Sequence, residues 1–107
     1  RDHLADDARV SFVLDAGVRF LRQQPAMSFD LVFADAGPGK YEARDLALGL
    51  VKPGGFYVGD DMLPQANWPA GHQPRVDDLL DELRRSPGWS VVAPVWGSGF
   101  VIATRRA

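Results

Sequence analysis

Three apolar runs in the chain lack polar alternation, and each one ends on an acidic residue. They cover residues 10–15, 31–35 and 56–61. An apolar run of this length predicts a strand buried on both faces, as in a parallel sheet. Because the carboxyl ends of parallel strands meet at one edge of the sheet, we expect the terminal acids Asp15, Asp35, Asp60 and Asp61 to gather there. That edge is where open α/β sheets bind ligands.

Helical periodicity separates these runs and predicts three helices, over residues 16–24, 41–51 and 74–85. In the third, the apolar positions recur at helical spacing, at Val76, Leu79, Leu80 and Leu83. Before this helix, residues 62–74 form a long irregular segment rich in proline and glycine. A loop of that length inside a compact domain is usually functional or mobile.

The end of the chain has a different pattern. Residues 89–96 and 100–104 are both typical of strands, and only Gly97-Ser98-Gly99 joins them, which predicts an antiparallel hairpin. Pro94 has no N–H group to donate, so we expect its strand at the sheet edge and the last strand inside. The predicted fold class is α/β, with a mostly parallel sheet, helices on both faces and this C-terminal hairpin.

Composition narrows the functional classes. The 107 residues fit one domain, and the net charge of −2 gives no sign of a nucleic-acid-binding surface. No apolar stretch approaches the ~20 residues of a membrane span. The chain has no cysteine, which excludes disulfides, zinc–thiolate sites and a thiol nucleophile. We therefore expect a cytoplasmic protein with neither nucleic acid nor membrane as a partner.

The terminal hairpin on a parallel α/β sheet resembles the class I methyltransferases, which use S-adenosylmethionine. Segments similar to the bacterial O-methyltransferases related to the catechol enzyme span nearly the whole chain: residues 29–36, Tyr41, residues 52–55, Asp60-Asp61 and residues 99–106. The resemblance implies a Rossmann-like sheet. It also implies methyl transfer to a hydroxyl oxygen of a small-molecule acceptor.

The glycine-rich cofactor loop of that family has no counterpart in this chain. Gly37-Pro38-Gly39 cannot replace it, because the dinucleotide fingerprint needs glycine where Glu42 stands. In the family, the missing strands lie between the strand ending at Asp15 and the strand ending at Asp35. Without them, two apolar strands would have unpaired edges.

The chain also opens on arginine rather than methionine. We therefore expect residues 1–107 to be one incomplete domain, the C-terminal portion of a longer methyltransferase. If it stands alone, it is expected to be unstable or to pair with another chain, such as a second copy through its sheet edges.

The resemblance implies a cofactor site at the strand ends. Asp15 and Ala16 match the position that contacts the adenine, and Asp35, Ala36 and Tyr41 also fall at the cofactor. A carboxylate can accept a hydrogen bond from the exocyclic amine, and the adjacent backbone N–H can meet a ring nitrogen. The alternative is that Asp15 only caps the helix that begins at Ala16.

The resemblance further implies a metal site and a catalytic base. Asp35, Asp60 and Asp61 match a metal triad whose third member is usually asparagine, and oxygen ligands suit Mg²⁺. Such an ion would anchor two vicinal hydroxyls of the acceptor and orient one oxygen toward the methyl group. Alternatively, these acids cap loops without a metal. Lys40 is the candidate base beside Asp35, and the alternative is a solvated lysine at a helix start.

Trp68 and His72 lie in the long irregular segment and could line an acceptor pocket, because aromatic faces bind planar rings. Alternatively, Trp68 only holds the loop against the domain. Two other functions remain open. One is a non-catalytic, methyltransferase-like remnant that binds a partner through its strand edges. The other is a nucleotide-binding fragment of a dehydrogenase, against which the terminal hairpin argues.

Overall fold

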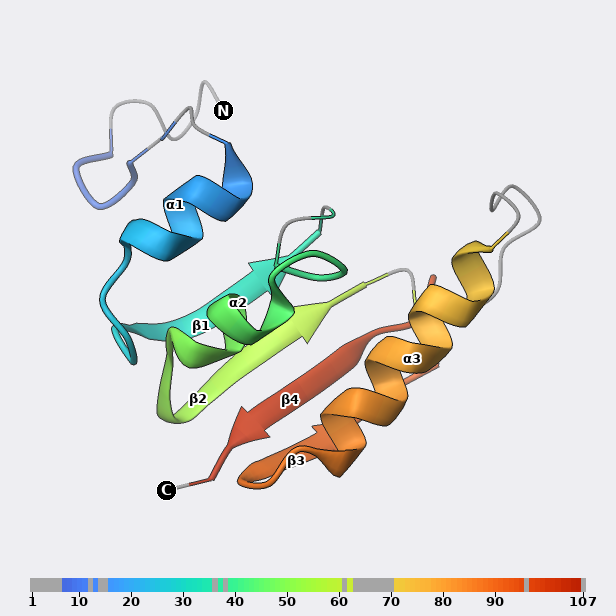
Figure 1. The fold of residues 1–107 in the computed structure, drawn as a ribbon. Coiled ribbons are helices and arrows are strands. Elements are labelled where there is room, and N and C mark those ends of the chain that lie inside the picture. The colour runs from blue at the N-terminus through green and yellow to red at the C-terminus, as the bar shows by residue number, and fades with distance from the viewer. Residues whose placement is uncertain are drawn as a thin grey trace.

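The computed structural model describes residues 7–11, 13, 16–35, 37, 39–60, 62, 71–95 and 97–106. They form a four-stranded sheet with helices packed against it (Figure 1). The elements in chain order are α1 (Gly17–Gln23), β1 (Phe29–Ala34), α2 (Arg44–Gly49), β2 (Val51–Gly59), α3 (His72–Arg85), β3 (Trp89–Val92) and β4 (Val101–Arg105). None of the helices in this described part is long and apolar enough to cross a lipid bilayer.

The strand order is β1-β2-β4-β3. β1 and β2 pair in parallel, while β4 is antiparallel to both of its neighbours. β1, β2 and β3 therefore share one direction. This arrangement confirms the predicted α/β class and the C-terminal hairpin, with β4 inside the sheet and β3 at its edge. The edge strand ends at Val92, just before Pro94, whose carbonyl accepts a hydrogen bond from the Phe100 N–H.

The core lies between the sheet and α2 and α3, which cover the same face (Figure 1). Side chains alternate along each strand, and those on this face are buried, among them Tyr57, Val101 and Ala103. α3 buries the predicted positions Val76, Leu79 and Leu83 against them.

The other face of the sheet carries no helix from the described part of the chain. Its large apolar side chains on β1 and β2 stay exposed, notably Leu31, Phe33 and Phe56. The sequence predicted helices on both faces. An apolar strand thus marks a surface suited to burial, but the segment that would bury its second side need not lie within these 107 residues.

The predicted first strand, residues 10–14, is not formed where the structure describes it. Val10, Ser11 and Val13 lie outside any strand, and Val13 is exposed. A strand needs a hydrogen-bonded neighbour. No strand formed by the described residues lies beside this segment. The apolar run therefore has no described strand to pair with.

An irregularity at the start of β2 sets the register in which β1 and β2 end side by side. Phe29 pairs with Val51, but the next pair is Leu31 with Phe56, so the register shifts between them. A Cβ on Gly55 would stand 2.6 Å from the Asp30 carbonyl oxygen, which requires glycine there. After the shift the pairing continues regularly to Ala34 and Gly59. Residues 52–55, which lie between the predicted helix over 41–51 and the apolar run over 56–61, are therefore the irregular beginning of a strand, and α2 is shorter than predicted.

Candidate functional site

Two of the predicted acids leave the sheet side by side. Ala34 at the end of β1 pairs in parallel with Gly59 at the end of β2. Asp35 and Asp60 follow directly, so both lie at the carboxyl edge of this strand pair. Asp35 is exposed, whereas the Asp60 side chain is only 23% exposed. The other predicted site residues of this edge, Asp15, Ala36 and Asp61, lie outside the described residues.

Lys40 is buried at this edge. Its side chain is 4% exposed, and its Nζ donates a hydrogen bond to the backbone oxygen of Asp60. The same Nζ lies 3.9 Å from Asp60 Oδ1. The alternative of a solvated lysine is therefore wrong, because the ammonium group connects the loop after β1 to the end of β2. Whether Lys40 acts as a base stays a prediction.

The loop that carries Lys40 is a tight, well-anchored turn. The Gly37 carbonyl accepts hydrogen bonds from the N–H groups of Lys40, Tyr41 and Glu42. Gly39 has a φ of +84°, a left-handed conformation that favours glycine. Its carbonyl accepts a 2.7 Å hydrogen bond from the buried Tyr57 hydroxyl of β2. The hydrogen bond from Tyr57 therefore fixes the position of this loop relative to the sheet.

The raised pKa of Tyr57 favours the protonated hydroxyl that donates to the Gly39 carbonyl. Burial raises the pKa of its hydroxyl well above the ordinary value, while the nearby charge of Arg44 lowers it by less. The hydroxyl therefore stays protonated near neutral pH. It remains able to donate its hydrogen bond to Gly39.

A ring cluster forms the side of the site next to α3. The rings of Tyr41 and His72 meet edge to face, with centroids 5.5 Å apart. The Arg75 guanidinium lies 4.5 Å from the centre of the Tyr41 ring, and Lys40 Nζ lies 5.3 Å from it. The first turn of α3 therefore packs beside the loop after β1. Trp68, the other aromatic candidate, lies outside the described residues.

Two arginines that the sequence reasoning missed stabilise this arrangement. Arg44 donates a 2.8 Å hydrogen bond to the Lys40 carbonyl and forms an ion pair with Glu82 of α3. Arg75 stands three residues after His72, and this spacing places both on one side of a helix. That spacing could have indicated Arg75. Arg44 had no comparable signal, because its partner Glu82 is distant in the sequence.

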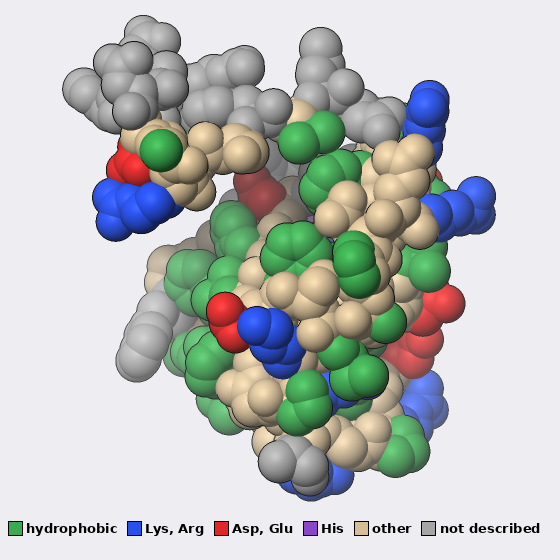
Figure 2. Space-filling model, turned by 90° about the vertical axis from the view of Figure 1, so that its left-hand side faces the viewer, with side chains coloured by type: hydrophobic (Ala, Val, Ile, Leu, Met, Phe, Trp, Pro, Cys, Tyr) green, Lys and Arg blue, Asp and Glu red, His purple; other side chains and the backbone are tan. Residues whose placement is uncertain are grey.

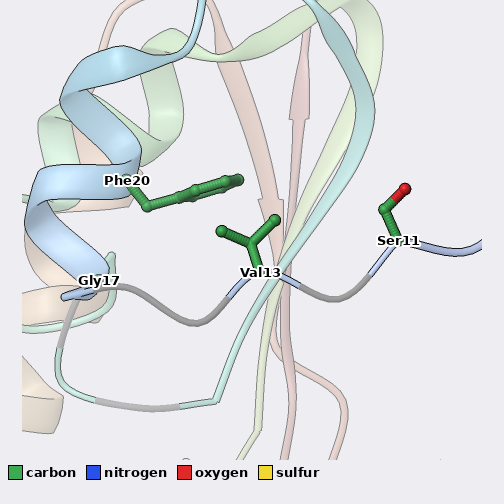
Figure 3. A pocket seen from close by; sticks show the side chains of 4 residues that line it. All are labelled: Ser11, Val13, Gly17 and Phe20. Atoms are coloured by element: carbon green, nitrogen blue, oxygen red, sulfur yellow. The ribbon is translucent and has the colours of Figure 1, made fainter.

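A hollow of about 310 Å³ lies beside α1. Ser11, Val13, Gly17 and Phe20 line it, and Figure 3 shows the Phe20 ring lying close to Val13 while Ser11 stands apart. Ala16, which was predicted to contact adenine, is the N-cap residue of α1. In the sequence it stands between the lining residues Val13 and Gly17. Among the described lining residues of the hollow, Val13 and Phe20 are apolar and Ser11 carries a hydroxyl group.

The described residues do not assemble the predicted metal site. Among them, no group of three His, Cys, Asp or Glu side chains is placed to hold a metal ion. Asp35 and Asp60 lie at one edge, but the third predicted ligand, Asp61, is not described. The Lys40 ammonium already faces the Asp60 carboxylate. A cation bound to Asp60 would meet this like charge.

Comparison with known proteins was informative at the level of structure. No protein-family model and no curated protein matches the sequence. A solved structure of a Corynebacterium glutamicum protein superposes with a TM-score of 0.82 at 20% identity, covering 99% of this chain and 52% of that one. A Podospora anserina methyltransferase with bound SAH (S-adenosylhomocysteine) gives a TM-score of 0.73 at 18% identity, covering 99% of this chain and 53% of that one.

An O-methyltransferase from Bacillus cereus, solved in complex with SAH, gives a TM-score of 0.64 at 21% identity. It matches 83% of this chain and 46% of its own. The chain thus spans about half the length of the solved proteins it matches. Together these structures confirm the predicted fold, which this chain shares with about half the length of two solved methyltransferases.

Proposed function

We propose that this chain forms one half of an O-methyltransferase, which transfers a methyl group from S-adenosylmethionine to a hydroxyl oxygen of a small-molecule acceptor. The parallel register of β1 and β2 carries the proposal, because it brings Asp35 and Asp60 to one edge. That edge is where α/β sheets bind their ligands. The fold is shared with about half the length of two solved methyltransferases that bind SAH. A small-molecule acceptor and a cytoplasmic location belong to the same hypothesis.

The residues on either side of Ala16 support a place for the adenosine. The hollow lined by Val13, Gly17 and Phe20 offers apolar walls to the adenine, and Ser11 adds a hydroxyl group. The exposed carboxylate of Asp35 would accept hydrogen bonds from the cofactor at the sheet edge. Tyr41, the other predicted cofactor residue, follows in the loop after β1. When bound, S-adenosylmethionine supplies a sulfonium methyl group that an oxygen attacks in line.

The acceptor would lie over the edge formed by Asp35, Lys40 and Asp60. As the oxygen–carbon bond forms, the carbon–sulfur bond breaks, its electron pair goes to sulfur, and the acceptor hydroxyl loses its proton. Two described residues are the candidate bases for this proton: Asp35, whose carboxylate is exposed, and Lys40. Lys40 also holds Asp60 in place through its hydrogen bond to the backbone. The Tyr41–His72 pair would limit the acceptor on the α3 side.

Metal assistance is not part of the step that we propose. The described residues alone do not make a magnesium site, since no three of their His, Cys, Asp or Glu side chains gather to hold a metal ion and the Lys40 ammonium lies 3.9 Å from Asp60 Oδ1. We therefore expect cofactor binding to be unchanged when EDTA replaces Mg²⁺ in the buffer. Loss of binding in EDTA, with recovery on adding Mg²⁺, would contradict this expectation.

Calorimetric titration with SAH tests the proposal directly. We expect micromolar binding to the folded chain and a loss of about tenfold in affinity for Asp35→Asn, since one charged hydrogen-bond acceptor is removed. Asp45→Asn, an exposed position in the first turn of α2, is the matched control and should bind as the original chain does. Absence of heat with a folded sample would overturn the proposal. It would favour the remnant that binds a partner, for which the exposed apolar face of the sheet is the supporting observation.

A further inference from the structure

Among the residues that the structure describes, Lys40 is the only charged one that is buried. Elsewhere Lys, Arg, Asp and Glu side chains stand at the surface, as Figure 2 shows for one side of the molecule. Lysine is almost never fully buried without a partner, because taking its ammonium group out of water is costly. The groups that face Lys40 Nζ therefore show what its charge is for.

Contacts with two residues compensate the buried ammonium. Nζ donates a hydrogen bond to the backbone oxygen of Asp60 and lies 3.9 Å from Oδ1 of the same residue. The centre of the Tyr41 ring lies 5.3 Å from Nζ, within the range of a cation–π contact. The positive charge of Lys40 is thus held at the end of β2, against a carboxylate that the sequence predicted to bind a metal ion.

The surroundings of Lys40 fix it in this position. Arg44 donates a hydrogen bond to its carbonyl, and Tyr57 donates one to the carbonyl of the preceding residue, Gly39. A Cβ built on Gly59 would stand 3.7 Å from Lys40 Cε, so the aliphatic stem runs over the end of β2 in van der Waals contact. The loop after β1 therefore delivers the ammonium to one defined place beside Asp60.

We propose that the Lys40 ammonium is a built-in cation, which takes at Asp60 the place that the sequence predicted for a divalent metal ion. A metal ion bound to the Asp60 carboxylate would meet the ammonium as a like charge at short range, and this repulsion weakens its binding. Lys40 is then a positioning residue that acts through Asp60. The Asp35 carboxylate remains as the group that takes the proton of the acceptor. This last consequence rests on the proposed methyl transfer, whereas the assignment of the cation does not.

Titration with Mn²⁺, followed by NMR, tests this assignment. Mn²⁺ takes the same oxygen ligands as Mg²⁺, and its unpaired electrons broaden the amide resonances of nearby residues. Lys40→Met keeps an apolar stem but removes the ammonium. We expect it to bind Mn²⁺ about tenfold or more tightly than the original chain does, with selective broadening of the Asp35 and Asp60 amides.

Lys52→Met is the matched control. Lys52 and Asp30 form an exposed pair, with Nζ 3.4 Å from Oδ1, near the starts of β2 and β1. The substitution changes the net charge as Lys40→Met does, but at the opposite end of the strand pair. Because exposed charges are screened by salt, the Mn²⁺ affinity at residues 35 and 60 should change by less than about twofold. Adding Asp60→Asn to Lys40→Met should return this affinity to that of the original chain.

Three results would overturn the inference. The first is Mn²⁺ binding at residues 35 and 60 of the original chain that is as tight as in Lys40→Met. The second is a gain in Lys40→Met that survives Asp60→Asn. The third needs no variant: selective broadening of the Asp35 and Asp60 amides of the original chain at micromolar Mn²⁺. No cofactor is present in these titrations, so a failed SAH titration would remove the methyl transfer and leave the Lys40 assignment standing.

Discussion

Two regions of the sheet carry similarly apolar side chains but differ in how far these side chains are buried. On the side of α3, Tyr57, Leu79 and Val101 are fully buried. On the side of β1, Leu31 and Phe33 are as apolar but about half exposed. The difference is in what covers them: α3 contributes an apolar stripe to the first region, whereas no described helix lies on the face that carries Leu31 and Phe33. Hydrophobic sequence therefore marks surfaces suited to burial, and only the fold shows which of them this chain buries itself.

The largest effect is expected in the covered region. Leu79→Ala should lower the free energy of unfolding by about 2–5 kcal/mol, because it removes buried methyl groups and leaves a cavity. Leu79 is fully buried within the cluster that joins α3 to the sheet. Urea denaturation followed by circular dichroism measures this change.

Phe33→Ala is the control from the open region. Phe33 is 53% exposed, so it gains only part of the transfer energy of a core aromatic. Its substitution should lower the free energy of unfolding of the isolated chain by less than about 1 kcal/mol. Equal losses for Leu79→Ala and Phe33→Ala would show that the helix-free face of the sheet is covered within the chain. The contrast between the two regions would then be wrong.

A smaller loss of unfolding free energy is expected at the carboxyl edge of β1 and β2, where Lys40 is buried. Lys40→Met keeps the buried stem but removes the ammonium that donates to Asp60. Hydrogen bonds to charged groups contribute about 1.5–3 kcal/mol, and we expect a loss of unfolding free energy in this range. Lys52→Met removes a comparable lysine from an exposed pair with Asp30 and should cost less than about 1 kcal/mol. If both variants cost the same, Lys40 contributes no more than a surface charge.

The smallest effect concerns the anchor beneath the loop. Tyr57→Phe should cost about 0.5–1.5 kcal/mol, because the Gly39 carbonyl loses its donor. Burial raises the pKa of Tyr57 in the folded chain, so the folded state keeps the hydroxyl proton where the unfolded state releases it. The contribution of this group is therefore complete below the unfolded value near 10 and is lost as pH rises above it.

Unfolding measured between pH 8 and about 11 separates this contribution from that of other titrating groups. The original chain should lose stability more steeply above about pH 10 than Tyr57→Phe does. Parallel curves for the two proteins would show that the Tyr57 hydroxyl does not couple to folding.

Much of the architecture could be predicted from local pattern. The spacing of Val76, Leu79 and Leu83 predicted α3 and its buried face, and Pro94 predicted that the first hairpin strand, which ends at Val92, lies at the sheet edge. These predictions succeeded because the apolar stripe and the missing N–H group act through neighbours that the chain itself contains.

The unsuccessful expectations depended on partners that sequence pattern does not reveal. Residues 10–14 looked as apolar as β1, yet the described part of them forms no strand. For the site, the parallel strands allowed Asp35 and Asp60 to be placed at one edge. The burial of Lys40 and the contact of Arg75 with Tyr41 depend on how α3 meets the loop, which no local spacing specifies.

The position of β4 has a consequence for biosynthesis. The last strand of the chain lies between β2 and β3, both of which are made before it. While the ribosome still holds residues 101–105, the centre of the sheet is a gap, and Tyr57 has no β4 beside it. The nascent chain therefore cannot complete this core until residues 101–105 have left the ribosome. Before that moment, β1 and β2 can pair, whereas β3 has no strand beside it.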